Sequence, residues 1–297
     1  MTSVPRPLFD QALLGARLDR AWRNAGANQG ADFLLSRAVA DMVERLGAVK
    51  RTFGLCLDVG TPGPQAAAAL AQMPGIAAVR RFAPTALSLG DGRFLGEVGD
   101  IEALPFAAGG ADLIVSLLAL QHVNDLPGAF EQFRRALRPD GLMIACLLGG
   151  DTLRELRQSL TIAESEISGG AAPRVAPFAE LRALGGLLQR AGFALPVVDV
   201  EPITVRYDHI LVLMRDLRAM GAANALHARS RRPLRRAILA RAGEIYAQKF
   251  ADPDGRLRAS FEIIWLSGWA PHASQQKPLR PGAAAMRLAD ALKAGGG

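Results

Sequence analysis

The chain has 297 residues, half of them hydrophobic, and a formal charge of +7 that comes mainly from arginine. This length suits one large α/β domain with an appended region, or two small domains. No apolar run is long enough to cross a bilayer, and residues 1–10 lack the basic-then-apolar pattern of a secretion signal. Cys56 and Cys146 lie in apolar runs, which indicates buried thiols in a reducing cytoplasm rather than a disulfide. The histidines show no metal-ligand spacing, so no metal is expected.

Apolar residues at helical spacing between positions 9 and 50 predict a helical N-terminal segment. Short apolar runs then predict strands that alternate with helices. The strands are expected at 53–59, 77–82, 94–99, 111–117 and 142–148, and the helices at 65–73 and 126–137, the second stopped by a turn at 138–141. Because each run is apolar throughout, we expect a parallel sheet covered on both faces.

The pattern changes after Gly150 and favours helices. We expect helices at 152–166, capped by Asp151, at 178–191, ended by Gly192, and at 209–221 and 233–250, with an edge strand at 196–207 and a last strand at 261–270. We therefore expect the chain to divide into three segments. They are an N-terminal helical segment (1–50), a nucleotide-binding core (51–150) and a mostly helical half that binds substrate or partner (151–297). The tail after Lys277 is expected to be loosely ordered.

Arginines cluster in one stretch of the second half, at Arg229, Arg231, Arg232, Arg235 and Arg236. No aromatic residue is interleaved there, which argues against a stacking platform for nucleic acid. A solvated helix face is the simplest interpretation. A docking patch for an acidic protein or a lipid headgroup is the alternative.

Ligands of open α/β sheets bind outside the carboxyl ends of the strands. Four pieces of this chain would meet there, namely 57–64 (LDVGTPGP), 80–82 (RRF), 99–106 (GDIEALPF) and 116–125 (SLLALQHVND). In this order, and followed by RPDGL at 138–142, the pieces resemble the class I methyltransferases. The resemblance implies a Rossmann-like three-layer sandwich with a mainly parallel sheet and helical C-terminal additions. It also implies S-adenosylmethionine as the cofactor.

Further motifs resemble one branch of that family, the mitochondrial complex I assembly factor 5 group and its alphaproteobacterial relatives. They are LFD at 8–10, RLDRA at 17–21, VNDLP at 123–127, GGDTLRELR at 149–157 and GWAPH at 268–272. A more distant cousin is the enzyme that esterifies the malonyl carrier protein in biotin synthesis. The resemblance implies action on an arginine of a respiratory complex I subunit, as hydroxylation in the mitochondrial member.

The cofactor site implied by the resemblance draws on the ends of several strands. Asp58 would hold the methionine ammonium, although a strand-end aspartate also caps turns. Glycines let the backbone approach a ligand closely. Asp100 would contact the adenine amine, unless it is an ordinary turn residue. The remaining candidates are Gly60, Gly63, Ile101 and Leu117.

Two residues depart from the family pattern. Pro62 removes a backbone donor and adds a ring where the family has glycine. Arg81 stands where most members place an acid that holds both ribose hydroxyls, and a guanidinium cannot accept a proton from them. An arginine at this place also resembles a reader of the NADP 2′-phosphate, an alternative that the other motifs do not favour.

The catalytic candidates are His122, Asp151 and Glu155. His122 would act as a general base with a near-neutral pKa, or else be a structural histidine. Asp151 and Glu155 are four residues apart, so they would share a helix face and grip a substrate guanidinium. A capped helix with a solvated face is the simpler interpretation of that pair.

Three functions remain open from the sequence. The first is an S-adenosylmethionine-dependent methyltransferase, or a related arginine hydroxylase, acting on a protein substrate such as a complex I subunit. The second is a catalytically degenerate member that serves as an assembly or binding factor, which Pro62 and Arg81 favour. The third is a basic protein associated with lipid or nucleic acid, and it rests on net charge alone. A cytoplasmic place at the inner face of the membrane, with peripheral association, fits the first two.

Overall fold

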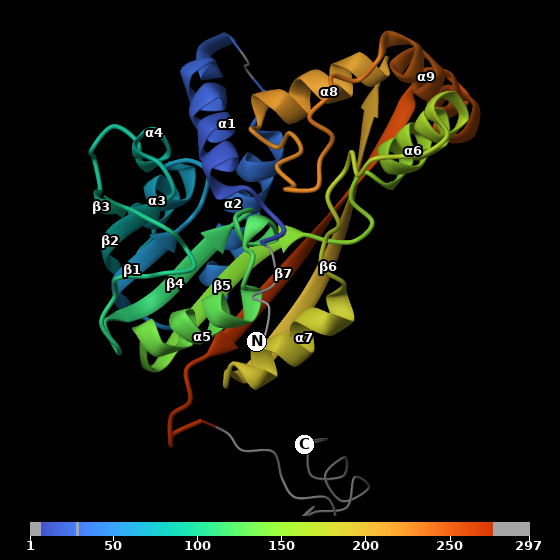
Figure 1. Cartoon of the computed structure of the whole chain (residues 1–297). Coiled ribbons are helices and arrows are strands. Elements are labelled where there is room, and N and C mark those ends of the chain that lie inside the picture. The colour runs from blue at the N-terminus through green and yellow to red at the C-terminus, as the bar shows by residue number, and fades with distance from the viewer. Residues whose placement is uncertain (1–6, 28–29, 276–297) are drawn as a thin grey trace, which may run out of the picture.

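The computed structural model of the protein describes residues 7–27 and 30–275, and its centre is one seven-stranded sheet (Figure 1). The strand order is β3-β2-β1-β4-β5-β7-β6. The strands are β1 Phe53–Val59, β2 Ile76–Ala83, β3 Leu95–Val98, β4 Ala111–Leu117, β5 Leu137–Leu148, β6 Ala194–Tyr207 and β7 Leu257–Trp269. The tail after Lys277, expected to be loosely ordered, lies outside the described residues.

The first five strands lie side by side and parallel, as expected. β7 enters between β5 and β6 and runs antiparallel to both. β5 differs from its expected bounds, because it begins at Leu137 directly after the preceding helix. The residues expected to form a turn make a bulge within that strand, with Asp140 at φ 64°.

Helices cover both faces of the sheet (Figure 1). One face packs against α2, α3, α6, α8 and α9, and the other against α5 and α7. The α-helices are α1 Gln11–Arg23, α2 Phe33–Gly47, α3 Gln65–Leu70, α4 Ala86–Leu89, α5 Leu126–Ala136, α6 Arg154–Ser168, α7 Leu181–Arg190, α8 Ile210–Ala219 and α9 Arg236–Phe250. A hydrophobic core lies on each face of the sheet, and successive residues of a strand, such as Cys56 and Leu57, pack into different cores. This explains why the strands are apolar throughout.

The second half of the chain is less helical than expected. It supplies β6 and β7, which are 14 and 13 residues long and complete the sheet. The sheet therefore runs across the expected boundary at residue 150, while the division of roles between the segments stays a prediction. No helix among the described residues combines the length and the apolar character needed to cross a bilayer.

Three local expectations can be compared directly with the helix ends. Gly192 follows α7 with φ 83°, which confirms its role at the C-terminal end of that helix. Asp151 does not cap α6, because the cap position belongs to Leu153, at φ 55°, and no side chain bonds to this end. The cluster from Arg229 to Arg235 is not a helix face, because α9 begins only at Arg236.

Two residues interrupt the hydrogen-bonding edge that β6 presents at one side of the sheet. β6 is the edge strand, and an edge strand of this length is a template for aggregation. Pro202 has no N–H to offer a partner strand. The N–H of Val200 donates to the Asp199 side chain at 2.8 Å, so it is unavailable to a partner as well.

Candidate functional site

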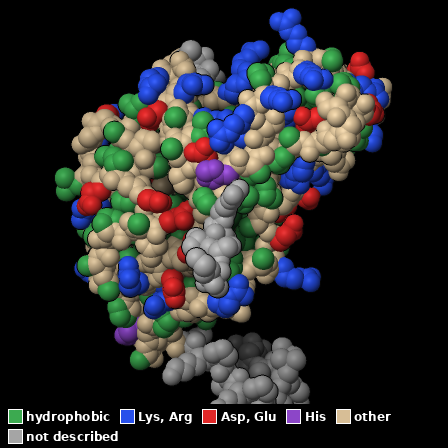
Figure 2. All heavy atoms as spheres, in the orientation of Figure 1, with side chains coloured by type: hydrophobic (Ala, Val, Ile, Leu, Met, Phe, Trp, Pro, Cys, Tyr) green, Lys and Arg blue, Asp and Glu red, His purple; other side chains and the backbone are tan. Residues whose placement is uncertain are grey.

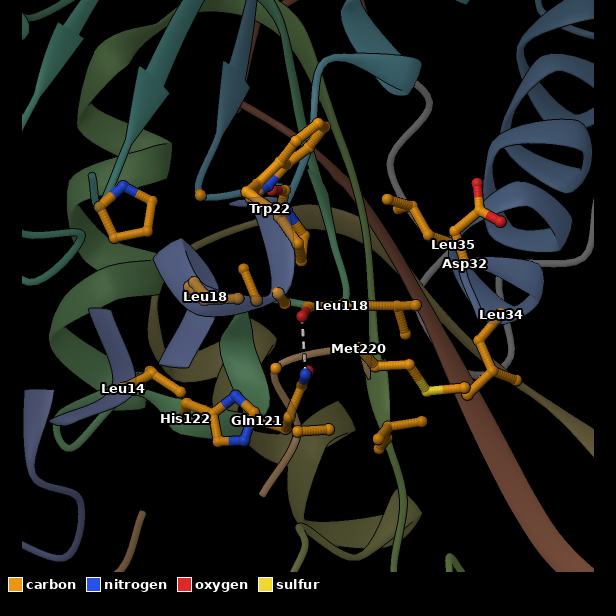
Figure 3. Close-up of a pocket in the computed structure, with 18 of the residues that line it drawn as sticks. Leu14, Leu18, Trp22, Asp32, Leu34, Leu35, Leu118, Gln121, His122 and Met220 are labelled. Atoms are coloured by element: carbon orange, nitrogen blue, oxygen red, sulfur yellow. Dashed lines mark hydrogen bonds between the residues drawn. The ribbon is translucent and has the colours of Figure 1, made fainter. Parts of the chain in front are cut away.

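A pocket of about 610 Å³ opens at the carboxyl ends of β1, β2 and β4, where the motifs were expected to meet (Figure 3). Its volume is in the range of small-molecule sites. Most of its wall is apolar, and the labelled side chains in Figure 3 surround one space. They come from α1, α2, the loop after β4 and the end of α8, and include Leu14, Leu18, Trp22, Leu34, Leu35, Leu118 and Met220.

Helix α1 forms one wall of the pocket and is fixed at both ends. Asp10 caps the helix, accepting the Leu13 N–H at 3.0 Å. Near the other end, Trp22 Nε1 donates to the carbonyl oxygen of Pro62 at 2.6 Å. The leucines between these points, Leu14 and Leu18, are buried. The expected N-terminal helical segment is therefore part of the site rather than a separate unit.

The loop after β1 holds the glycines expected to approach a cofactor. Gly60 lines the pocket with φ 74°, and a Cβ there would lie 2.8 Å from Ile101 Cδ1. A side chain at this position would therefore clash as well as strain the backbone. Gly63 does not line the pocket. A Cβ on it would lie 2.6 Å from Trp22 Cζ2, so this glycine makes room for α1.

Arg81 and Asp58 face each other inside the protein rather than in the pocket. Their strands pair with these residues in register, and Arg81 Nε lies 2.9 Å from Asp58 Oδ2 with both side chains fully buried. Every remaining N–H of the guanidinium can be satisfied by backbone carbonyl oxygens. Nη1 donates to Ser88 and Leu89 at 2.7 and 2.6 Å, and Nη2 to Thr61 and Gly63 at 3.1 and 2.7 Å.

This arrangement decides two expectations about the pair. Asp58 is not placed to hold a ligand ammonium, because its side chain is buried beside Arg81 and lines no part of the pocket. Arg81 is not placed to read a ribose 2′-phosphate, because its donors are already used. Burial raises the pKa of the Asp58 carboxyl, and the guanidinium of Arg81 opposes that rise.

The pocket also keeps the expected adenine-side residues, and Ile101 lies next to Gly60. Asp100 and Ile101 both line it. Asp100 Oδ1 accepts the Glu102 N–H at 2.9 Å, which orients the carboxylate. Leu117 lies behind the wall, fully buried, and its N–H donates to Thr61 Oγ1 at 3.1 Å. Its contribution is to support the glycine loop rather than to touch a ligand.

His122 lies at the pocket as expected, but it is not poised to act as a base near neutral pH. Burial lowers its pKa to about 4. Its ring packs edge-on against Phe9, with centroids 5.4 Å apart. Beside it, Gln121 Nε2 donates to the Leu118 carbonyl oxygen at 2.6 Å, and Gln121 Oε1 has no partner among the described residues (Figure 3).

Asp151 and Glu155 do contact one guanidinium, but it belongs to Arg154 of this chain, whose Nη1 lies 3.4 Å from Asp151 Oδ2 and whose Nε lies 3.4 Å from Glu155 Oε1. Asp151 precedes α6 and is exposed, whereas Glu155 is 3% exposed. Glu155 accepts the backbone N–H of Ser260 at 3.1 Å and the Ser260 hydroxyl at 2.5 Å. The expected shared face is absent because the helix starts after Asp151 and turns Glu155 toward β7.

Trp22 and Met220 line the pocket but were not predicted from the sequence, whereas Leu118 and Gln121 lie in the stretch 116–125 that was expected at this edge without being singled out. The helical spacing around Trp22 was visible, but nothing local showed that its indole reaches Pro62. Leu118 has φ 51°, an uncommon conformation for leucine, at the point where the chain leaves β4. Such strain concentrates at functional sites, but no sequence pattern revealed it.

Comparisons with known proteins agree with this fold. Residues 57–145 match the methyltransferase domain family. The mitochondrial arginine-hydroxylase NDUFAF5 of Danio rerio is 36% identical over an alignment 297 residues long, which covers 97% of this chain and 90% of that protein. The chain belongs to the class I methyltransferase-fold family that includes NDUFAF5.

Other members of this wider family carry different names. The malonyl-[acyl-carrier protein] O-methyltransferase of Methylovorus (strain MP688) is 35% identical over 283 residues, covering 89% of this chain and 91% of that protein. A solved phosphoethanolamine N-methyltransferase 2 of Haemonchus contortus, with S-adenosylhomocysteine bound, has a TM-score of 0.53 at 17% identity. It aligns with 87% of this chain and 60% of its own. That likeness shows the shared fold and nothing about substrate.

Proposed function

We propose that this member of the NDUFAF5-containing family is an S-adenosylmethionine-dependent enzyme that modifies an arginine of a protein substrate, a subunit of respiratory complex I. The observation that carries the proposal is the pocket at the strand ends, which combines Gly60 with Asp100 and Ile101. The name of its near full-length relative, an arginine-hydroxylase, supplies the arginine as the target residue. The pocket size supports a cofactor together with a substrate side chain.

The residues present fit the adenosyl end of the cofactor. Asp100 carries an acceptor for the adenine amine, and Ile101 offers an apolar surface beside it. Gly60 leaves the backbone open to close approach. When bound, the cofactor supplies an electrophilic methyl group on its sulfonium. The protein's part is to hold that end of the ligand and to keep the reacting centre among apolar side chains.

The amino acid end of the cofactor has no obvious partner from the expected positions. Asp58, which was expected to hold the ammonium, is paired with Arg81. The ribose also lacks its usual acceptor, because β2 contains no carboxylate that could line the pocket. Gln65 lines the pocket, and its Oε1 has no partner among the described residues. An amide oxygen can accept a hydroxyl proton. Because Oε1 is shielded beside Gly63, we assign Gln65 to the sugar with a rotation of its side chain that brings this oxygen into the pocket.

Calorimetry with S-adenosylmethionine and S-adenosylhomocysteine tests the proposal. We expect binding to the wild-type protein, weakened roughly tenfold or more in Asp100→Asn, which exchanges an acceptor for a donor. Asp91→Asn, on an exposed loop, is the matched control and should bind as the wild type does. If the folded protein binds neither ligand at millimolar concentration, the proposed enzymatic function is excluded, and the catalytically degenerate assembly factor is the function that remains.

Reaction type and substrate need a separate experiment. Complex I subunits would be incubated with the protein and S-adenosylmethionine, in parallel samples with and without molecular oxygen and a reductant, and analysed by mass spectrometry for modified arginines. An added methylene group identifies methyl transfer, and an added oxygen atom identifies hydroxylation. We place the protein at the cytoplasmic face of the membrane that holds its substrate, with peripheral association. Release of the protein from membranes by salt tests that placement.

A further inference from the structure

Much of the positive charge of this protein lies in one stretch of the chain, part of which lines the pocket. Residues 208–236 contain seven arginines, two aspartates, and no lysine or glutamate, so this stretch holds most of the chain's net charge of +7. It comprises α8 and the connection to α9. Figure 2 shows arginine and lysine side chains gathered over α1 and α8.

Two segments bring this charge to the pocket. Helix α1 carries Arg17 and Arg20 on the same helix as the wall residues Leu14 and Leu18. Helix α8 carries Arg215 and Arg218, and the residues that follow it, 219–222, line the pocket. The segments touch, because a Cβ on Gly221 would lie 3.0 Å from Leu18 Cδ2. We call Arg17, Arg20, Arg215, Arg218 and Arg229 the arginine rim.

The rim has few counter-ions within the described protein. Arg229 pairs with Asp10 at 3.3 Å, whereas Arg20, Arg215 and Arg218 form no ion pair among the described residues. Arg17 Nη1 is buried and has no hydrogen-bond partner there. Burial and the neighbouring charges of Arg229 and Arg20 lower the pKa of Arg17. A buried guanidinium donor without a partner costs free energy that an incoming anion would recover.

Three kinds of anionic partner carry suitable charge. Nucleic acid is disfavoured because residues 208–236 contain no aromatic side chain on which bases would stack. A membrane surface is disfavoured because Leu211, 47% exposed, is the only large hydrophobic residue of this stretch that is well exposed among the described residues. Interfacial helices need a broader apolar face to anchor them. Carboxylates of a protein match the forked guanidinium geometry best.

We propose that the arginine rim docks an acidic segment of the protein substrate, so that the neighbouring target residue enters the pocket. This proposal deepens the proposed function by naming the charge of the substrate around its target. An acidic flank would also speed encounter, since complementary charge steers association. A rotation of the Arg17 side chain would expose its unpartnered Nη1, which would then donate to a carboxylate of that segment.

Fluorescence anisotropy with a labelled peptide of alternating glutamate and serine tests the surface, using the full chain. We expect Arg215→Glu/Arg218→Glu to weaken binding roughly tenfold or more, and Arg17→Gln to weaken it a few-fold. Arg182→Glu/Arg190→Glu on α7 makes the same charge change on exposed arginines away from the rim. That control should stay within about twofold of the wild type.

Two results would overturn the proposal. Equal loss in the α7 control would show that net charge alone attracts the peptide. Absence of peptide binding, with rim-dependent sedimentation on phosphatidylglycerol vesicles, would assign the surface to a membrane. Calorimetry with S-adenosylmethionine on the same variants separates this proposal from the function above. If the protein binds no cofactor but binds the peptide through the arginine rim, the proposed enzymatic function is refuted and the docking surface is supported.

Discussion

The guanidinium of Arg81 lies against the carboxylate of Asp58, with Nε 2.9 Å from Oδ2 and both side chains fully shielded from solvent. The same guanidinium donates to carbonyl oxygens of the loop after β1 and of α4. This chain therefore has a buried cation at the position where the family pattern places an acid that faces the ligand. The guanidinium holds the glycine loop in place through these hydrogen bonds. Its removal should therefore lower the stability of the protein.

Replacing Arg81 with methionine should destabilise the protein by about 3–5 kcal/mol, because a buried carboxylate loses its partner. The loss should shrink in acid, since a protonated Asp58 needs no counter-ion and burial already raises its pKa. Urea unfolding at several pH values measures both effects. Arg80→Met is the matched control, because Arg80 pairs with Glu97 at 2.9 Å on the surface and such pairs contribute only about 0–1 kcal/mol. Similar losses in both variants would contradict the assignment.

Restoring the family pattern with Pro62→Gly and Arg81→Asp is expected to fail as a repair. From the sequence, this double variant should gain cofactor binding. In the structure it places two carboxylates side by side in a fully buried site, which is strongly unfavourable. We expect a lower unfolding midpoint than for Arg81→Met and no gain of affinity in calorimetry. A stable double variant with tighter cofactor binding would show that the ion pair is dispensable.

Trp22→Phe should loosen α1 without emptying the pocket wall. The variant keeps an aromatic ring but loses the hydrogen bond from Nε1 to the Pro62 carbonyl oxygen. We expect a loss of about 0.5–1.5 kcal/mol and faster amide hydrogen exchange in α1. Trp269→Phe is a suitable control, because Trp269 lies at the far end of β7. Unchanged exchange in α1 would show that its leucines alone hold it in place.

His122 should make the protein less stable in mild acid. Its pKa is lowered to about 4 in the folded chain from an ordinary value of 6.5. Between these values the unfolded chain binds a proton that the folded chain does not, so stability falls as pH drops from 6.5 toward 4, by at most about 3 kcal/mol. His122→Asn should flatten this part of the curve. The same substitution at His227, an exposed histidine, is the matched control.

The sequence by itself determined the order of the elements and most of the sheet. Strands β1 and β4 have the expected bounds, because continuous apolar runs between turn signals are local patterns. The pocket location followed as well, since parallel strands gather their carboxyl ends at one edge. Gly60, Asp100, Ile101 and His122 line it as expected.

Only the tertiary structure decided how the charged side chains are used. Arg81 could have pointed into the pocket, but strand register set it beside Asp58, 23 residues away. Glu155 was expected beside a substrate and instead bonds Ser260, 105 residues along the chain. Helix α1 became a pocket wall through Trp22 and Pro62, 40 residues apart. Local periodicity fixes which face of an element is buried, whereas the partner of a polar group depends on contacts between distant segments.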